Sequence, residues 1–141
     1  MSEPVAYLLD TNVISETRKR KANPGVRAFL DACDTSILFL SVLTLGELYK
    51  GVEKKRREDP EAADSIAEWV KGVEQSYRLN IVGINAATAQ LWGEWSSGRS
   101  RPVVDTLLAA TAVQHRLTFV TRNGRDVDGL PVTVLNPWLE E

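Results

Sequence analysis

Carboxylate side chains are the groups in this sequence best suited to chemistry. The 141 residues include a single histidine, His115, and a single cysteine, Cys33. A zinc site built on histidines or a Ser-His-Asp triad needs a histidine with suitable partners, and a disulfide needs a second cysteine. Any chemistry must therefore come from oxygen ligands. The acids whose positions favour such a role are Asp10, Glu47, Asp105 and Asp126.

Asp10 ends a short apolar run at residues 5–9 and is followed by Thr11 and Asn12. The run has the length of a buried strand in a parallel sheet, and the polar residues after it indicate a strand that ends where a helix begins. Ligands bind at this edge of α/β sheets. The alternative is that Asp10 or Thr11 only caps the helix. A chemical role for Asp10 therefore depends on other carboxylates that meet it.

Asp105 lies early in an apolar helical segment, on the same face as Leu108 and Ala112. An unpaired buried charge costs several kcal/mol, so this carboxylate needs a cation, a hydrogen-bond partner or a raised pKa. A structural alternative exists, because an acid in the first turn of a helix interacts favourably with the helix dipole. We favour the functional interpretation.

Glu47 and Asp126 are less informative when each is considered alone. Glu47 lies away from the main apolar face of its helix, and a surface ion pair with Lys50 explains it equally well. Asp126 comes shortly after a predicted strand, at the kind of edge that also carries Asp10. A local turn that uses the aspartate side chain is the competing explanation.

Short apolar runs alternate with helical patterns along the whole chain. Strands are predicted at residues 5–9, 37–40, 79–84, 118–121 and 132–135. Helices are predicted at residues 12–17, 24–33, 42–57, 60–77, 85–95 and 103–116. This alternation predicts a single α/β domain over residues 1–141, a three-layer α/β/α sandwich around a mostly parallel central sheet.

Composition is that of a soluble globular protein, with 43% hydrophobic and 26% charged residues and a net charge of −2. We expect a cytoplasmic protein, because no signal peptide is recognisable and no segment approaches the roughly 20 apolar residues of a membrane span. Basic blocks occur at residues 18–21 and 54–57. They are either solvated faces or patches that attract phosphate, and the sequence leaves both open.

The four acids and their surroundings resemble a known family. Asp10 lies in LLDTNVISE, Glu47 in SVLTLGEL, Asp105 in PVVDTLLAATA and Asp126 in TRNGRDV, and LNPW closes the chain. These motifs resemble the PIN-domain nucleases, especially the VapC and FitB-like toxins of bacterial toxin–antitoxin pairs. The resemblance covers essentially the whole chain. One departure is Val127, since members commonly carry an aromatic residue after the last acid.

The resemblance implies a biological role as well as a fold. It implies metal-dependent hydrolysis of RNA phosphodiester bonds, which would make the protein a ribonuclease toxin. It also implies a homodimer and a small antitoxin whose C-terminal segment covers the site. The antitoxin would bind DNA through its N-terminal part, so the toxin would contact DNA only indirectly, and no membrane is involved.

Several carboxylates in one pocket require cations. Two like charges about 4 Å apart repel by about 4 kcal/mol at an effective dielectric constant near 20. Hard divalent ions with oxygen ligands, Mg²⁺ or Mn²⁺, suit such a site, and one or two of them would activate a water and stabilise the leaving oxygen. We expect Asp10, Glu47 and Asp105 to be the ligands, and Asp126 to bind a second or weaker ion.

Polar and basic neighbours of the acids have supporting roles in this hypothesis. Asn12, Thr121 and Asn123 could position ligands or water, although each could equally serve a turn or a cap. Arg122 and Arg125 are candidates for phosphate contact.

Other functions fit less well. A phosphatase of the haloacid dehalogenase type needs a second aspartate two residues after Asp10, where this chain has Asn12. A receiver domain needs an aspartate near Ser41 to accept the phosphoryl group. The remaining alternative is a non-catalytic PIN-like scaffold that binds RNA or protein, and the presence of all four acids argues against it.

Overall fold

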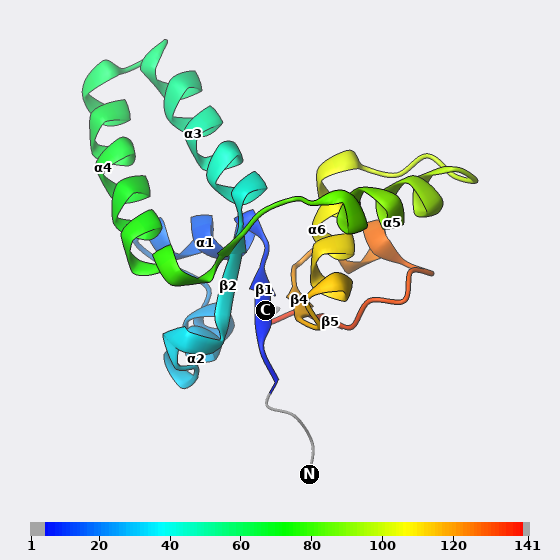
Figure 1. Ribbon diagram of the computed structural model, residues 1–141. Helices are drawn as coiled ribbons and strands as arrows, with labels where there is room; N and C mark the ends of the chain where they lie inside the picture. Colours follow the sequence, from blue (N-terminus) through cyan, green and yellow to red (C-terminus); the bar gives the residue numbers. More distant parts are fainter. Residues whose placement is uncertain (1–4, 140–141) are drawn as a thin grey trace.

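A five-stranded parallel sheet forms the centre of the computed structural model, which describes residues 5–139 (Figure 1). Its strands are β1 (Tyr7–Leu9), β2 (Leu38–Ser41), β3 (Ile81–Val82), β4 (Thr118–Val120) and β5 (Val134–Leu135). The strand order is β3-β2-β1-β4-β5, and every pairing is parallel. From β1 the chain first builds outward through β2 to β3, and it then crosses back to β4 and β5. The order therefore reverses between β1 and β4.

Six α-helices connect the strands, and several begin at a side chain that caps the first turn. They are α1 (Thr11–Arg18), α2 (Pro24–Ala32), α3 (Val42–Arg56), α4 (Pro60–Ser76), α5 (Ala86–Ser96) and α6 (Val103–Gln114). The side chains of Asn23, Asp59 and Asn85 accept hydrogen bonds from backbone N–H groups in the first turns of α2, α4 and α5. None of the helices in residues 5–139 combines the length and hydropathy that a membrane span requires.

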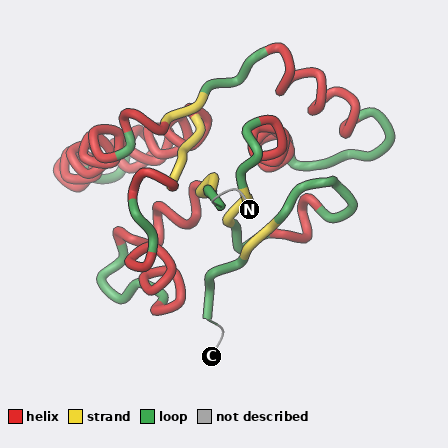
Figure 2. The backbone as a smooth tube through the Cα atoms, turned by 60° about the horizontal axis from the view of Figure 1, so that its bottom comes forward, coloured by secondary structure: helices red, strands yellow, loops and turns green. Residues whose placement is uncertain are grey.

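Two apolar cores lie on opposite faces of the sheet. Successive residues of a strand point to opposite faces, so Leu9 and Val120 pack with helices α1 to α4, whereas Leu8 and Phe119 pack with α6. Figure 2 shows the strands between these two groups of helices. The predicted three-layer architecture is therefore confirmed, and both central strands are buried on both faces.

The strand predicted at residues 79–84 is wrong at its start. Residues Arg78–Asn80 form a 3-10 turn, Leu79 is 86% exposed, and the strand itself is limited to Ile81–Val82. The amide of Asn80 causes this difference, because it donates hydrogen bonds to the backbone oxygens of Thr35, Ser36 and Leu38 at 3.0–3.1 Å. A side chain that binds three carbonyl groups of a distant segment overrides the local apolar pattern. A second 3-10 turn likewise replaces the expected start of β2 at Ile37.

Gly25 allows the C-terminal segment to cross the start of α2. A Cβ atom at this position would lie 2.2 Å from the backbone oxygen of Pro137. We expect Gly25→Ala to lower the free energy of unfolding by about 2–3 kcal/mol, because the backbone must shift to accommodate the methyl group. Urea unfolding measures the change. Gly72→Ala in α4 is the matched control, since nothing lies within 4 Å of its Cβ position, and it should stabilise the helix by up to about 1 kcal/mol.

Candidate active site

Asp10 and Thr121 meet at the point where the strand order reverses. Asp10 follows β1 and Thr121 follows β4, and the Thr121 hydroxyl donates a 2.8 Å hydrogen bond to Oδ2 of Asp10. Both side chains are buried. Asp10 also caps α1, because its Oδ1 accepts a 2.7 Å hydrogen bond from the N–H of Thr11. The capping interpretation is therefore correct, and the same carboxylate also lies at the edge where α/β proteins bind ligands.

Glu47 joins this edge from α3. The hydroxyl of Thr11 donates a 2.5 Å hydrogen bond to Oε1 of Glu47, and the hydroxyl oxygens of Thr11 and Thr44 are 3.2 Å apart. Within residues 5–139 Glu47 forms no ion pair with Lys50 or with any other cation. The surface ion pair considered from the sequence is therefore not formed. Instead, Glu47 is oriented by the residue that directly follows Asp10.

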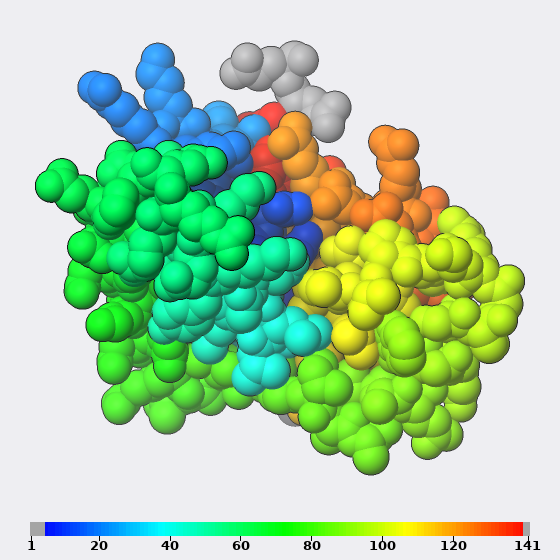
Figure 3. Space-filling view, turned by 90° about the horizontal axis from the view of Figure 1, so that it is seen from above, coloured from blue at the N-terminus to red at the C-terminus, as the bar shows by residue number. Residues whose placement is uncertain are grey.

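Asp105 and Asp126 complete a cluster of four acids, called here the carboxylate cluster. Burial raises the pKa of Asp105 to about 6, and repulsion from Asp10, Asp126 and Glu47 adds to the effect, as does a side-chain hydrogen bond with Asp126. The pKa of Asp10 is also raised, mainly by burial. Seen from the carboxyl ends of the strands, the dark-blue start of the described chain lies between α3, α6 and the orange segment after β4 (Figure 3). The structure thus places Asp10, Glu47 and Asp126 close enough to Asp105 to repel its charge.

The carboxylate cluster lacks a compensating positive charge. Within residues 5–139 none of its four members has a lysine or arginine nitrogen within 4.0 Å. Glu16 shows the contrast: this buried acid binds Lys19 at 2.9 Å and the N–H of Asn23, and these partners lower its pKa. Among the residues that the structure describes, a lysine thus pairs with this structural acid, whereas no lysine or arginine pairs with the cluster.

The donor set fits a hydrated divalent cation better than a closed metal cage. Among residues 5–139 no three His, Cys, Asp or Glu side chains are grouped closely enough to enclose an ion as they stand. Mg²⁺ usually keeps several waters and binds proteins through one or two carboxylates. An open group of acids, in which hydroxyl groups hold Asp10 and Glu47, suits such an ion. A cage of all-protein ligands would need a tighter arrangement.

The predicted supporting residues take up different places. Thr121 contacts Asp10 directly, and the backbone N–H of Asn123 donates a 3.0 Å hydrogen bond to the Thr121 hydroxyl. Asn12 and Asn123 line a cavity of about 340 Å³ together with Arg122, whose guanidinium lies 5.5 Å from the ring centroid of Trp138. These side chains are exposed at the rim. Arg125 is exposed as well and does not line this cavity.

Sequence reasoning missed three residues that shape the site. Thr11 was considered only as a helix cap and Thr44 was not singled out, yet the Thr11 hydroxyl bonds to Glu47 and the Thr44 hydroxyl lies beside it. Arg101 precedes α6 and donates hydrogen bonds to the backbone oxygens of Asp126 and Asp128, at 3.5 and 3.0 Å. These hydrogen bonds connect the loop that contains Asp126 to the start of α6, which contains Asp105. Only the spacing of three residues between Thr44 and Glu47 could have pointed to one of them.

The raised pKa of Asp105 predicts how the metal-free protein responds to pH. With a folded-state pKa of about 6 and a model value of 3.8, the folded protein retains a proton that the unfolded chain has lost. The stabilising contribution is complete below the unfolded pKa and disappears as the pH rises through about 6. After allowance for solvent screening the loss is about 1–2 kcal/mol. Urea unfolding across this range should show a larger fall in stability in the wild type than in Asp105→Asn, which keeps only the contribution of Asp10 with its raised pKa.

The comparison with known families agrees with the fold. The sequence model of the PIN domain matches residues 7–129, which is most of the chain. The protein therefore belongs to the PIN-domain family, as its motifs predicted.

Individual relatives are similar over nearly their whole length. The chain is 32% identical to Toxin FitB of Neisseria gonorrhoeae, with 93% of this chain and 97% of that protein covered. It is 29% identical to VapC ribonuclease Y4jK of Sinorhizobium fredii, with 93% and 96% covered. The crystal structure of FitAcB from Neisseria gonorrhoeae superposes with a TM-score of 0.84 at 30% identity, covering 94% of this chain and 98% of that one.

Proposed function

We propose that this protein is a metal-dependent endoribonuclease that acts as the toxin of a type II toxin–antitoxin pair. The observation that carries the proposal is the carboxylate cluster, in which Asp10, Glu47, Asp105 and Asp126 converge without a cation at the switch point of the sheet. The similarity to a FitB toxin and to a VapC ribonuclease supports it.

Mg²⁺ or Mn²⁺ is the cofactor that this donor set favours. Asp10, Glu47 and Asp105 would hold the ion directly or through water, and Asp126 would hold a second or weaker one. When bound, the ion supplies an activated water and a positive charge that accepts the phosphate. The same charge makes an acidic pocket suitable for an anionic RNA backbone.

The chain itself provides orientation and phosphate contact. The hydroxyl groups of Thr121 and Thr11 fix the carboxylates of Asp10 and Glu47, which keeps their oxygens directed at the cluster. Arg122, held over Trp138, and Arg125 would contact phosphates at the rim. Asn12 and Asn123 would position water from the same side.

The proposed partners follow from the relatives. FitAB has been solved bound to a DNA fragment, and its structure superposes on this chain with a TM-score of 0.81 at 29% identity. We infer an antitoxin that covers the carboxylate cluster and carries the contact with DNA. Residues 1–141 would act as one domain within a homodimer. An RNA substrate places the activity in the cytoplasm.

RNA cleavage by the purified protein tests the proposal. Cleavage of a single-stranded RNA should require Mg²⁺ or Mn²⁺, and should disappear with EDTA or in Asp10→Asn. Equal cleavage under all three conditions would remove the metallonuclease hypothesis. If RNA remains intact under every condition, a non-catalytic PIN-like scaffold becomes the better description.

A further inference from the structure

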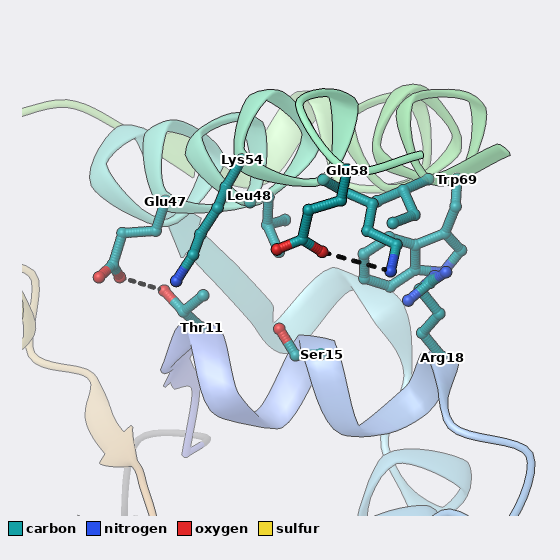
Figure 4. Close-up of a pocket in the computed structure, with 11 residues that line it drawn as sticks. Thr11, Ser15, Arg18, Glu47, Leu48, Lys54, Glu58 and Trp69 are labelled. Atoms are coloured by element: carbon teal, nitrogen blue, oxygen red, sulfur yellow. Dashed lines mark hydrogen bonds and ion pairs between the residues drawn. The ribbon is translucent and has the colours of Figure 1, made fainter. Parts of the chain in front are cut away.

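A second cavity opens directly beside the carboxylate cluster. It has a volume of about 320 Å³ and lies between α1 and the hairpin of α3 and α4 (Figure 4). Thr11 and Glu47 line it. Glu47 is a member of the carboxylate cluster, and the Thr11 hydroxyl donates a hydrogen bond to it. Glu47 is therefore shared between the carboxylate cluster and the lining of this cavity.

Part of the lining of this cavity is apolar and includes an aromatic ring. Trp69 lies at the end away from Glu47, and Leu48 and Ile66 add apolar surface to the same cavity. Trp69 is half-buried, so part of its indole ring remains accessible. Aromatic side chains in such positions stack on nucleic-acid bases, and each stacking contact stabilises binding by about 1–3 kcal/mol whatever the base.

Positive charges surround the same cavity. Arg18, Lys54 and Lys55 line it, and Lys55 is 3.8 Å from Glu58. Within residues 5–139 Arg18 and Lys54 form no ion pair. Figure 4 shows the Lys54 nitrogen directed toward Thr11 and the Arg18 guanidinium beside Trp69. A cation at each end of the cavity, with an aromatic ring beside one of them, is complementary to a nucleotide, which has an anionic phosphate and a planar base.

We propose that this cavity is a nucleotide subsite of the RNA-cleaving site. It binds the nucleotide next to the scissile phosphate, with its base stacked on Trp69 and its phosphates in contact with Lys54 and Arg18. The inference rests on the proposed ribonuclease function and adds to it a place for the substrate outside the carboxylate cluster. The subsite accepts any base by stacking, so cleavage specificity must come from elsewhere in the RNA.

RNA binding measured without metal tests the subsite separately from catalysis. The probe is a fluorescent single-stranded oligoribonucleotide of mixed sequence, and fluorescence anisotropy in EDTA gives its Kd. Trp69→Leu should weaken binding about 5- to 100-fold, and Trp69→Phe should restore most of it. Lys54→Gln, at an exposed position, should weaken binding and reduce the salt dependence by about 0.7 in log–log slope.

Matched variants control for folding and for general charge. Trp92→Leu alters a half-buried tryptophan on α5, and Lys71→Gln removes an exposed charge on α4, and neither residue lines the cavity. Both should bind RNA as the wild type does. Circular dichroism should show that Lys54→Gln and Trp69→Phe are folded.

The two hypotheses fail in different ways. Unchanged Kd values in both Trp69→Leu and Lys54→Gln would overturn the subsite, even if the wild type cleaves RNA with Mg²⁺. The cavity would then be better explained as a binding site for a protein segment. Weakened binding in these variants supports the subsite. If the wild type then fails to cleave RNA under any condition, only the proposed ribonuclease function is lost.

Discussion

Replacing Asp105 by asparagine will abolish RNA cleavage while the metal-free protein remains at least as stable as the wild type. We expect a loss of at least about 100-fold in the cleavage rate, because the variant lacks a ligand of the ion that activates water. Stability should not fall, since the pKa of Asp105, raised to about 6 by burial and by repulsion from the other acids, shows that its charge is unfavourable in the folded protein. An asparagine avoids that repulsion.

Two measurements on the same preparation check this result. The cleavage rate is measured with Mn²⁺ or Mg²⁺, and the melting temperature is measured in EDTA near neutral pH. Asp128→Asn is the control, because Asp128 is exposed and its backbone oxygen, not its side chain, accepts the hydrogen bond from Arg101. A marked fall in the melting temperature of Asp105→Asn would mean that Asp105 has a structural role.

Asp10→Ala should differ by losing stability as well as activity. Its carboxylate caps α1 and accepts a hydrogen bond from the hydroxyl group of the buried Thr121. The lost cap costs about 1 kcal/mol and an unsatisfied buried hydroxyl about 1–3 kcal/mol. Relief of repulsion within the carboxylate cluster offsets part of this cost, so we expect a net loss of about 2 kcal/mol. Cleavage should fall at least about 100-fold, as for Asp105→Asn.

A cap outside the site provides the comparison for Asp10→Ala. Asp34 accepts a 2.9 Å hydrogen bond from the N–H of Ser36 at an exposed 3-10 turn, and it belongs to no part of the carboxylate cluster. Asp34→Ala should lose less than about 1 kcal/mol of stability and retain full cleavage. If Asp10→Ala cleaved RNA as efficiently as Asp34→Ala, Asp10 would be only a helix cap.

Structure that depends on residues close together in the sequence could be predicted for this protein. The apolar run before Asp10 and the helical patterns at residues 24–33 and 60–77 predicted β1, α2 and α4 within a few residues of their positions. The alternation of strands and helices determined the three-layer fold. Acids that follow strands could also be predicted to meet, because the carboxyl ends of parallel strands share one edge.

Contacts between distant segments could not be predicted. Thr11 and Glu47 are 36 positions apart, and their hydrogen bond depends on how α1 packs against α3. Asn80 ends the expected strand early because it reaches the carbonyl groups of residues 35–38. Arg101 acts on a loop about 25 positions away. Each of these side chains has an ordinary local pattern, and only tertiary packing gives it a role.

The hydrogen bond between Thr121 and Asp10 spans 111 positions of the chain, and this separation has a consequence for protein synthesis. A growing polypeptide that has not yet reached β4 contains three of the four acids. It lacks Thr121, which follows β4 and donates the hydrogen bond that orients Asp10. Such an intermediate should be harmless to the cell that makes it, and so should any fragment left by premature termination. Cleavage activity would thus arise only once almost the entire chain has been translated and folded.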